Sequence, residues 1–440
     1  MPAEPGPMPA DTLGPASRVP PDSPALRRVQ AGDLCAGCGG CASIAPDKLR
    51  MALVEPGFLR PVQSAPLSPV EEDTIAAICP GLGQRVEDAG RTPSVLWGPY
   101  LEMQTGWATD PDLRFAGSSG GALSMLLCHL LETGAVDGVI QTAAAPQLSI
   151  GNGTVLSTRS EGVLAAAGSR YAPSAPLEGL HARLTASPAQ RFAFVGKPCD
   201  VAALRALQEQ DPGLAARVPV LLSFFCAGVP SLRGGLEVLA ALEAPYQDTV
   251  AFRYRGNGWP GYATATLADG TTRQMSYHDS WGRILSRHVQ HRCKICADGT
   301  GTAADLVCAD AWEADEKGYP LFDEQEGVSL IVARTVKGQQ ILAAAQAAGR
   351  LETAPFDPTI LAAIQPGQRE RRRALLARLA GLRVCGRPVP DYRGLTLKAA
   401  AAQNPLGRNL RNFFGMIRRS LRRKPGRPRL FTLPSGSSHD

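Results

Sequence analysis

The 440-residue sequence lacks several features that mark whole classes of protein. No run approaches the roughly 18 uninterrupted apolar residues of a membrane-spanning helix. The N-terminal region is rich in proline and alanine, and it lacks a basic start followed by an apolar run, so we expect no secretory signal. The length suggests about two or three domains, and apolar residues make up an ordinary 44%. We therefore expect a globular, cytoplasmic protein.

The cysteine count excludes an ordinary disulfide framework. Eleven cysteines are an odd number, and a chain without a signal peptide stays in a reducing compartment. Their clustering is more informative, because Cys35, Cys38 and Cys41 lie three residues apart, and Cys293 and Cys296 repeat that interval. Cysteines at this spacing in a reducing compartment are typical of metal binding.

Charge is unevenly distributed along the chain. The chain has 46 basic and 40 acidic residues. The segment from Pro366 to Phe431 contains 18 of the basic residues and only two of the acidic ones, so the rest of the chain has 28 basic and 38 acidic residues. An acidic body thus carries a basic tail. On a helix over 406–423, apolar side chains gather on one side, opposite six arginines. The apolar ones are Leu406, Leu410, Phe413, Phe414, Ile417 and Leu421.

This tail helix has three interpretations. It can lie peripherally on an anionic membrane at the inner face, pack against the acidic body, or dock an acidic ferredoxin or other electron donor protein. We expect no nucleic acid partner.

Strands and helices interleave through the middle of the chain, which predicts an α+β fold with a mixed α/β core sheet and flanking helices. We expect helices over 122–131, 202–207 and 336–348, strands over 136–142, 191–195, 218–225 and 328–335, and a β-hairpin over 262–275. Gly134 is the expected end of the first helix.

The first constellation is Cys35, Cys38 and Cys41 with Cys79 before Pro80. Small residues between the three cysteines permit the tight turns that wrap an iron–sulfur cluster. A ferredoxin repeat would usually have a cysteine where this chain has Ala45, so we predict a single cluster closed by Cys79. A structural zinc site is the alternative.

The second constellation, Cys293 and Cys296, supplies only two sulfurs. Cys199 and Cys226 each follow a predicted strand, so they are candidates for the other two, although a lone CxxC could be a redox dithiol. The isolated Cys128, Cys308 and Cys385 are interpreted as small buried hydrophobic residues.

Three glycine-rich or cationic segments could hold a cofactor. The turn 117–121 precedes a helix whose free N–H groups could bind a pyrophosphate, although such a turn is more often only a turn. Segments 168–171 and 253–259 add cationic and aromatic groups of the kind that contact a dinucleotide or flavin. Each of them could also be an ordinary loop.

Taken together, these motifs resemble the beta subunit family of coenzyme F420 hydrogenases and dehydrogenases, which includes enzymes of the 7-hydroxymethyl chlorophyll a reductase type. The resemblance covers roughly Leu34 to Gly349. The matching segments are the cysteine loop with Cys79-Pro-Gly, residues 117–121, 136–139, 167–174, 195–199, 225–231, 254–261, 293–298, 309–312 and 327–330. The family usually has glycine before Asp310, where this chain has Cys308-Ala309.

The resemblance implies FAD and two [4Fe–4S] clusters. It places Ser118, Ser119, Gly120, Gly121, Arg170, Lys197 and Asn257 at the flavin. We predict that Cys35, Cys38, Cys41 and Cys79 bind one cluster, and that Cys199, Cys226, Cys293 and Cys296 bind the second. Lys197 is the candidate catalytic residue, and the alternative is a solvated surface lysine.

The predicted function is an iron–sulfur flavoprotein oxidoreductase acting on an unidentified small-molecule substrate, of the coenzyme F420 type or another. The alternatives are an electron-transfer subunit for a catalytic partner chain, a reductase associated with polysaccharide biosynthesis, and a zinc-bearing interaction protein without flavin. The expected organisation is a disordered segment 1–28, a ferredoxin-like iron–sulfur module 29–92, the family's N-terminal-type domain 95–180 and C-terminal-type domain 185–350, and a basic helical tail 351–440.

Overall fold

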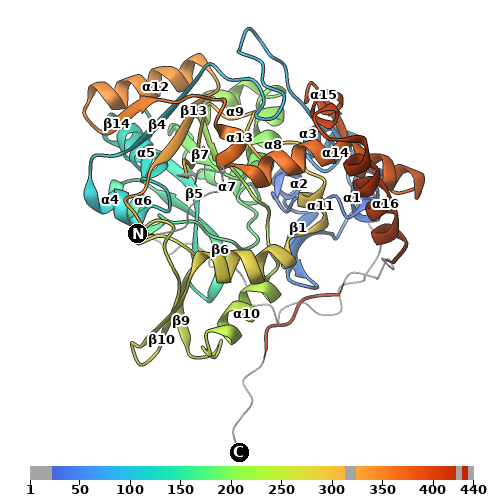
Figure 1. Cartoon of the computed structure of the whole chain (residues 1–440), viewed down its shortest axis with the longest axis horizontal. Helices are drawn as coiled ribbons and strands as arrows, with labels where there is room; N and C mark the ends of the chain where they lie inside the picture. Colours follow the sequence, from blue (N-terminus) through green and yellow to red (C-terminus); the bar gives the residue numbers. More distant parts are fainter. Residues whose placement is uncertain (1–21, 313–323, 423–428, 435–440) are drawn as a thin grey trace, which may run out of the picture.

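The computed structural model describes residues 22–312, 324–422 and 429–434 (Figure 1). Most of the segment expected to be disordered lies outside the described residues. However, helix α1 occupies Pro24–Gly32 and is capped by the Ser23 hydroxyl, which accepts the Leu26 N–H at 3.0 Å. The expected boundary at residue 28 is therefore too late, because a capped helix already spans it.

An eight-stranded sheet forms the centre of the molecule. Its strands pair antiparallel at both sides, whereas β5, β7, β8 and β12 pair parallel in the middle. The expected mixed α/β core sheet is confirmed. In spatial order the strands are β14 (Leu351–Pro355), β4 (Glu102–Ala108), β13 (Ser329–Ala333), β12 (Leu306–Asp310), β8 (Val220–Phe224), β7 (Phe192–Val195), β5 (Gly138–Ala145) and β6 (Leu148–Ser157).

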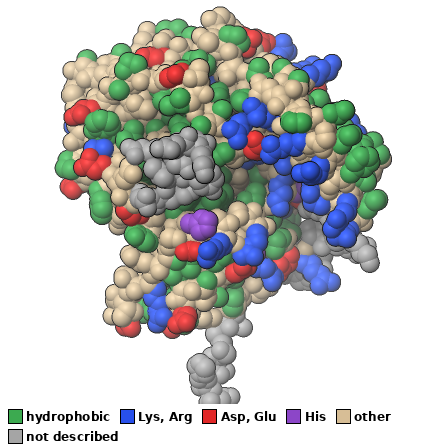
Figure 2. Space-filling model, viewed as in Figure 1, with side chains coloured by type: hydrophobic (Ala, Val, Ile, Leu, Met, Phe, Trp, Pro, Cys, Tyr) green, Lys and Arg blue, Asp and Glu red, His purple; other side chains and the backbone are tan. Residues whose placement is uncertain are grey.

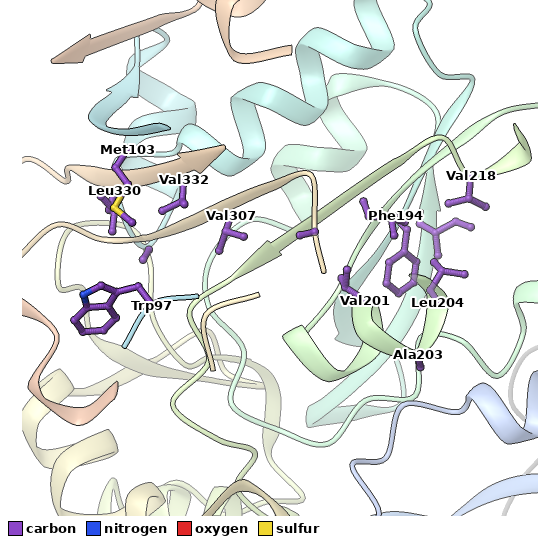
Figure 3. Close-up of a cluster of buried hydrophobic side chains, with 14 of the residues drawn as sticks. Trp97, Met103, Phe194, Val201, Ala203, Leu204, Val218, Val307, Leu330 and Val332 are labelled. Carbon is purple, nitrogen blue, oxygen red and sulfur yellow. The ribbon is translucent and has the colours of Figure 1, made fainter. Parts of the chain in front are cut away.

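Both faces of this sheet are buried, and successive strand residues alternate between them. In β8, Val220 and Leu222 pack into one apolar cluster while Leu221 packs into the other. The first face is covered by α5 (Ala122–Glu132) and α12 (Val336–Ala347). The second is covered by α8 (Pro198–Gln208) and α13 (Leu361–Ile364), whose cluster is drawn in Figure 3.

Shorter elements complete this region. Strands β9 (Thr249–Arg253), β10 (Ala263–Leu267) and β11 (Thr272–Met275) form a separate antiparallel sheet, in which β10 and β11 are the expected hairpin. The helices are α4 (Pro111–Ala116), α6 (Ser160–Ala165), α7 (Leu180–Ala186), α9 (Pro212–Arg217), α10 (Leu232–Ala241), η2 (His278–Ile284), η3 (Leu285–His288) and α11 (His291–Lys294).

The N-terminal module and the C-terminal tail pack together. The module contains α1, α2 (Gly40–Ile44), β1 (Leu49–Val54), β2 (Phe58–Gln63), α3 (Pro69–Ile78) and β3 (Gly83–Arg85). The tail contains α14 (Pro366–Val384), β15 (Asp391–Arg393), α15 (Leu397–Ala402) and α16 (Leu406–Arg422). Strand β15 pairs parallel with β3, and Leu375 and Leu379 of α14 share an apolar cluster with Val29 and Leu34.

The expected elements in the core are confirmed, with boundaries shifted by a few residues. Gly134 follows α5 with φ 66°, the left-handed conformation expected of a glycine at a helix end. Among the described residues, no helix is long and apolar enough to cross a membrane.

Candidate functional site

The first cysteine group consists of Cys35, Cys38, Cys41 and Cys79, and all four line one small, largely apolar cavity. Three belong to the loop and first turn of α2, and Cys79 caps the C-terminus of α3. Gly39, with φ 83°, lets the loop turn here, since a Cβ at this position would lie 2.7 Å from the Glu178 nitrogen.

The thiols of this group are buried and affect one another. Burial and, to a smaller extent, the neighbouring Cys35 raise the pKa of Cys79 to about 11. Burial likewise raises the pKa values of Cys38 and Cys41, with other thiols of the group adding to the effect. The backbone N–H groups of Gly81 and Leu82 act in the opposite direction and lower the pKa of Cys79. A bound metal cluster would supply the positive charge that four thiolates require.

The second cysteine group consists of Cys199, Cys226, Cys293 and Cys296, which come from three separate segments. Cys199 lies in the first turn of α8, Cys226 follows β8, and the last two lie at α11. The Cys226 N–H donates to the Gly299 carbonyl at 2.8 Å, and this bond holds the loop after β8 against the segment that follows Cys296. The structure thus brings the predicted residues of this group into one region.

The thiols of this group affect one another electrostatically. Burial raises the pKa of Cys226 to about 12, with further contributions from Cys293 and Cys296. Burial also raises the pKa of Cys199, to which Cys226 and Cys293 contribute. Among the described residues, no three His, Cys, Asp or Glu side chains surround the position of a single metal ion. A cubane cluster instead requires four thiolates spread around four irons.

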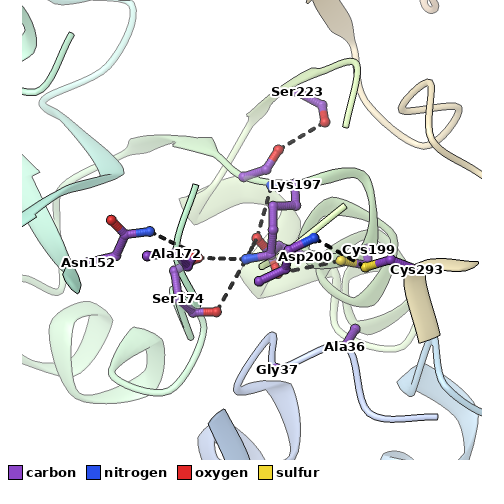
Figure 4. Close-up of polar contacts among 12 residues, drawn as sticks. Ala36, Gly37, Asn152, Ala172, Ser174, Lys197, Cys199, Asp200, Ser223 and Cys293 are labelled. Atoms are coloured by element: carbon purple, nitrogen blue, oxygen red, sulfur yellow. Dashed lines mark hydrogen bonds and ion pairs between the residues drawn. The ribbon is translucent and has the colours of Figure 1, made fainter. Parts of the chain in front are cut away.

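The two cysteine groups lie beside each other. The Gln290 side-chain nitrogen donates to the Ala36 carbonyl at 3.3 Å and to the Cys293 sulfur at 3.5 Å. Figure 4 shows the loop of Ala36 and Gly37 next to Cys199 and Cys293. One glutamine therefore connects the loop of the first group with a member of the second.

Lys197 is buried, so its interpretation as a solvated surface lysine is wrong. Its side chain is only 8% exposed, and its ammonium lies 2.8 Å from Asp200 and 2.6 Å from the Ser174 hydroxyl (Figure 4). Burial lowers the pKa of Lys197, but attraction to Asp200 and Cys199 outweighs it, and the pKa is raised. The cation therefore stays charged next to the second cysteine group.

A cavity of about 570 Å³ lies between the β5–β6 hairpin, segment 165–170 and the β9–β11 sheet. This volume is in the range of small-molecule and cofactor sites. Two residues predicted at the flavin, Arg170 and Asn257, line it, together with Ser169, Arg253 and Arg255. Asn257 has φ 55°, a conformation that is uncommon for residues other than glycine and is often found at functional sites.

The other residues predicted at the flavin do not line this cavity. The Ser118 hydroxyl lies 2.6 Å from that of Ser169, so it is one residue away from the cavity wall. Ser119 instead donates to the Ala309 carbonyl at 3.0 Å. Gly120 and Gly121 are packed against backbone of neighbouring segments, where a Cβ would come within 2.8 Å and 2.5 Å of other atoms. Lys197 does not line the cavity.

Arg170 supports the cavity wall. Its guanidinium donates to Asn152 Oδ1 at 2.6 Å and to the carbonyls of Gly151 and Phe252 at 2.7 Å and 3.1 Å. These bonds connect β6 with β9, the strands on either side of the cavity. Most of its donors are therefore already used within the protein.

An ion pair beside this cavity is not among the residues predicted at the flavin from the sequence. Arg255, which is 2% exposed, makes a bidentate pair with Asp310 at 2.7 Å and 2.8 Å, and the Trp259 indole donates to the same carboxylate at 2.9 Å. Attraction to Asp310 outweighs burial and raises the pKa of Arg255. Arg255 and Asp310 lie in segments that carry the family resemblance, and this position was the signal in the sequence that could have identified them.

Aromatic rings enclose this ion pair. The Trp259 and Trp312 rings stack at 4.8 Å between centroids, and the Arg255 guanidinium lies 5.0 Å from the Trp312 ring and 4.9 Å from the Tyr277 ring. Ala309, where the family usually has glycine, is buried in β12 and packs into the apolar cluster beneath these rings. The arrangement fixes Asp310 at the C-terminal end of β12.

Comparison with known families covers the region that contains both the cavity and the second cysteine group. Residues 103–181 match the N-terminal part, and residues 189–359 the C-terminal part, of the family described as coenzyme F420 hydrogenase/dehydrogenase, beta subunit. The chain belongs to this family. Members of the coenzyme F420 hydrogenase/dehydrogenase beta subunit family are parts of oxidoreductases. The first cysteine group lies before the matched residues, whereas the second lies within them.

Individual relatives are distant. The coenzyme F420 hydrogenase subunit beta of Methanococcus voltae is 25% identical over 59% of this chain and 86% of its own length. The corresponding subunit of Methanothermobacter thermautotrophicus is 23% identical, again over 59% and 86%. The F420-dependent formate dehydrogenase 1 subunit beta of Methanococcus maripaludis is 24% identical over 58% of this chain and 62% of its own.

A solved structure, from a study of xenon derivatization of the F420-reducing [NiFe] hydrogenase complex of Methanosarcina barkeri, contains a similar chain. It is 19% identical, with a TM-score of 0.47, over 66% of this chain and 94% of the other.

Proposed function

We propose that this protein is an iron–sulfur flavoprotein oxidoreductase that relays electrons between two [4Fe–4S] clusters and FAD. The observation that carries the proposal is the convergence of eight cysteines into two adjacent groups of four. A relay needs cofactors close to one another, and Gln290 contacts both groups. The domain boundaries expected from the sequence are part of this proposal, with the first group in residues 29–92 and the second in residues 185–350.

The 570 Å³ cavity is the proposed flavin site. Its wall offers the Arg253 guanidinium, the Ser169 hydroxyl and the Asn257 amide, which are suited to a phosphate, a ribose and a polar ring edge. When bound, a flavin exchanges two electrons with a substrate and single electrons with clusters. The residues of this chain would hold it and exclude water. The Arg255 cation lines the cavity, and the Lys197 cation lies next to the second cysteine group.

The substrate is proposed only as a class. The curated relatives are subunits of coenzyme F420-dependent hydrogenases and a formate dehydrogenase, which favours a deazaflavin or another small two-electron substrate. Because those relatives are subunits, an electron-transfer role for a catalytic partner chain is the second candidate function. A ferredoxin-type protein is the proposed electron donor in either case.

Anaerobic purification tests the proposal directly. The full chain should show a flavin spectrum over broad cluster absorption and contain about eight irons per chain. A colourless, zinc-loaded protein would contradict the proposal. Reduction of the bound flavin by a deazaflavin substrate without any partner chain would favour the enzyme, whereas a requirement for the partner would favour the electron-transfer subunit.

Helix α16 both packs on the body and leaves apolar side chains exposed. Met416 is buried, and Phe413 and Ile417 pack beside Gly381 of α14. Four other apolar side chains of the helix are between 46% and 75% exposed, and we call them the α16 stripe: Leu406, Leu410, Phe414 and Leu421. Figure 2 shows Lys and Arg side chains gathered over the region of the tail helices. We propose that the stripe contacts an anionic membrane surface peripherally, with the arginines facing the lipid headgroups.

A Leu410→Ser, Phe414→Ser double variant is expected to lose binding to anionic liposomes at low salt. Each large apolar side chain contributes about 1.5–3 kcal/mol on burial, so the partition coefficient should fall roughly 100-fold or more. Cosedimentation measures it, and Val70→Ser, which changes an even more exposed apolar residue on α3, is the control. Failure of the wild type to sediment with the liposomes would rule out the membrane interpretation.

A further inference from the structure

Arg292 lies between the two cysteine groups and is incompletely paired. It belongs to α11, immediately before Cys293, and is 2% exposed. Its Nη2 donates to the carbonyl of Pro80, the residue after Cys79, at 2.7 Å. One residue thus touches the backbone of the first group and is adjacent in sequence to a member of the second.

Two of its nitrogen atoms, Nε and Nη1, are buried without a hydrogen-bond acceptor among the described residues. No Asp or Glu in the described part of the chain forms an ion pair with it, and the Tyr392 ring lies 5.7 Å from the guanidinium carbon. A guanidinium is always charged, and burying it with unused donors costs several kcal/mol. The site therefore requires an anion.

Arg292 borders both groups, because it precedes Cys293 in α11 and its Nη2 donates to the carbonyl of the residue after Cys79. Its charge therefore acts on members of both groups.

We infer that Arg292 is a shared counter-cation for two iron–sulfur clusters, a positioning residue whose unpaired N–H donors would be available to cluster sulfur and whose charge would set the reduction potentials of both. This inference rests on the proposed function. Thiolate-ligated clusters are anionic, and N–H donors and nearby charge tune their potentials. Each one-electron reduction, with the electron supplied by the donor protein, adds a negative charge next to the guanidinium without making or breaking a bond. The cation therefore favours the reduced state of each cluster.

The test compares Arg292→Gln, which removes the charge but keeps an N–H donor, with Arg292→Lys, which keeps the charge. In redox titrations of the full chain followed by EPR, the Gln variant should lower the midpoint potentials of both clusters. The expected shift is at least the 59 mV that corresponds to a tenfold change in a one-electron equilibrium. The Lys variant should remain closer to the wild type, and Lys294→Met, which removes an exposed cation from the same helix, should shift neither potential as much.

Several outcomes decide the inference. Unchanged potentials in an iron-loaded Gln variant would overturn the inference. Loss of iron from both the Gln and the Lys variants would also overturn it, because cluster binding would then depend on the packing of the arginine side chain rather than on its charge. Loss of iron from the Gln variant alone would support it. A wild-type protein without iron would instead refute the proposed function, so the two failures are distinguishable.

Discussion

A Cys79→Ser variant is expected to retain about four irons per chain, half of the roughly eight expected for the wild type. Cys79 caps α3 and lines the same cavity as Cys35, Cys38 and Cys41, so it is the proposed fourth ligand of the first cluster. A serine oxygen is a harder, weaker ligand for this iron than a thiolate. Iron analysis of the anaerobic protein measures the loss, and the flavin content should stay at the wild-type level.

Two further cysteine variants give this experiment its controls. Cys293→Ser should remove the other half of the iron, because Cys293 belongs to the second group. Cys385→Ser should remove none, since Cys385 caps the end of α14 and belongs to neither group. If the iron content of the Cys79 variant equals that of the wild type, Cys79 is not a ligand.

A Lys197→Met variant is expected to destabilise the protein by about 3–5 kcal/mol, the usual cost of removing one partner from a buried ion pair. Asp200 is 1% exposed and would lose the cation at 2.8 Å. A lower urea midpoint measures the loss. The Lys197→Met, Asp200→Asn double variant is the matched control: it removes the unpaired charge, keeps an oxygen that can accept the residue-197 N–H, and should regain most of the stability.

The same variant tests the predicted role of Lys197 at the flavin. Lys197 lies outside the proposed flavin cavity, but a cation outside the cavity can still favour the anionic reduced flavin, so removing it should lower the flavin reduction potential. A spectroscopic titration of the Lys197→Met, Asp200→Asn variant against the wild type measures the shift without the loss of stability. If the flavin potential and FAD affinity are both unaltered, Lys197 is only a structural ion-pair partner between α8 and Ser174.

The isolated cysteines show where a local sequence pattern predicts the burial of a side chain and where it does not. Cys128 and Cys308 are buried in the apolar cluster beside α5, as expected of small hydrophobic residues. Cys385 is only half-buried, because it lies at a helix end, so its interpretation as a buried hydrophobic residue is wrong. Periodicity indicated which strands were buried, but it said nothing about the depth of a residue at the end of a helix.

The sequence by itself determined the cysteine loop, the core strands and the hairpin, because each depends on residues a few positions apart. Spacing and glycine content define a turn around Cys38, and alternation defines a buried strand such as β8. The sequence also determined that an apolar stripe forms along α16, since helical periodicity is a local property.

Only the tertiary structure decided which distant segments meet. The pairing of β15 with β3 joins the basic tail to the N-terminal module, and the convergence of Gln290 and Arg292 on both cysteine groups joins that module to the core. The tertiary structure also decided the partners of Asp310, because Arg255 and Trp259, which donate to its carboxylate, lie 55 and 51 residues away in the sequence. The sequence specifies the charge and the hydrogen-bonding capacity of a side chain. Its burial and its partners depend on how the whole chain packs, and burial and partners together set the free energy of a buried charge.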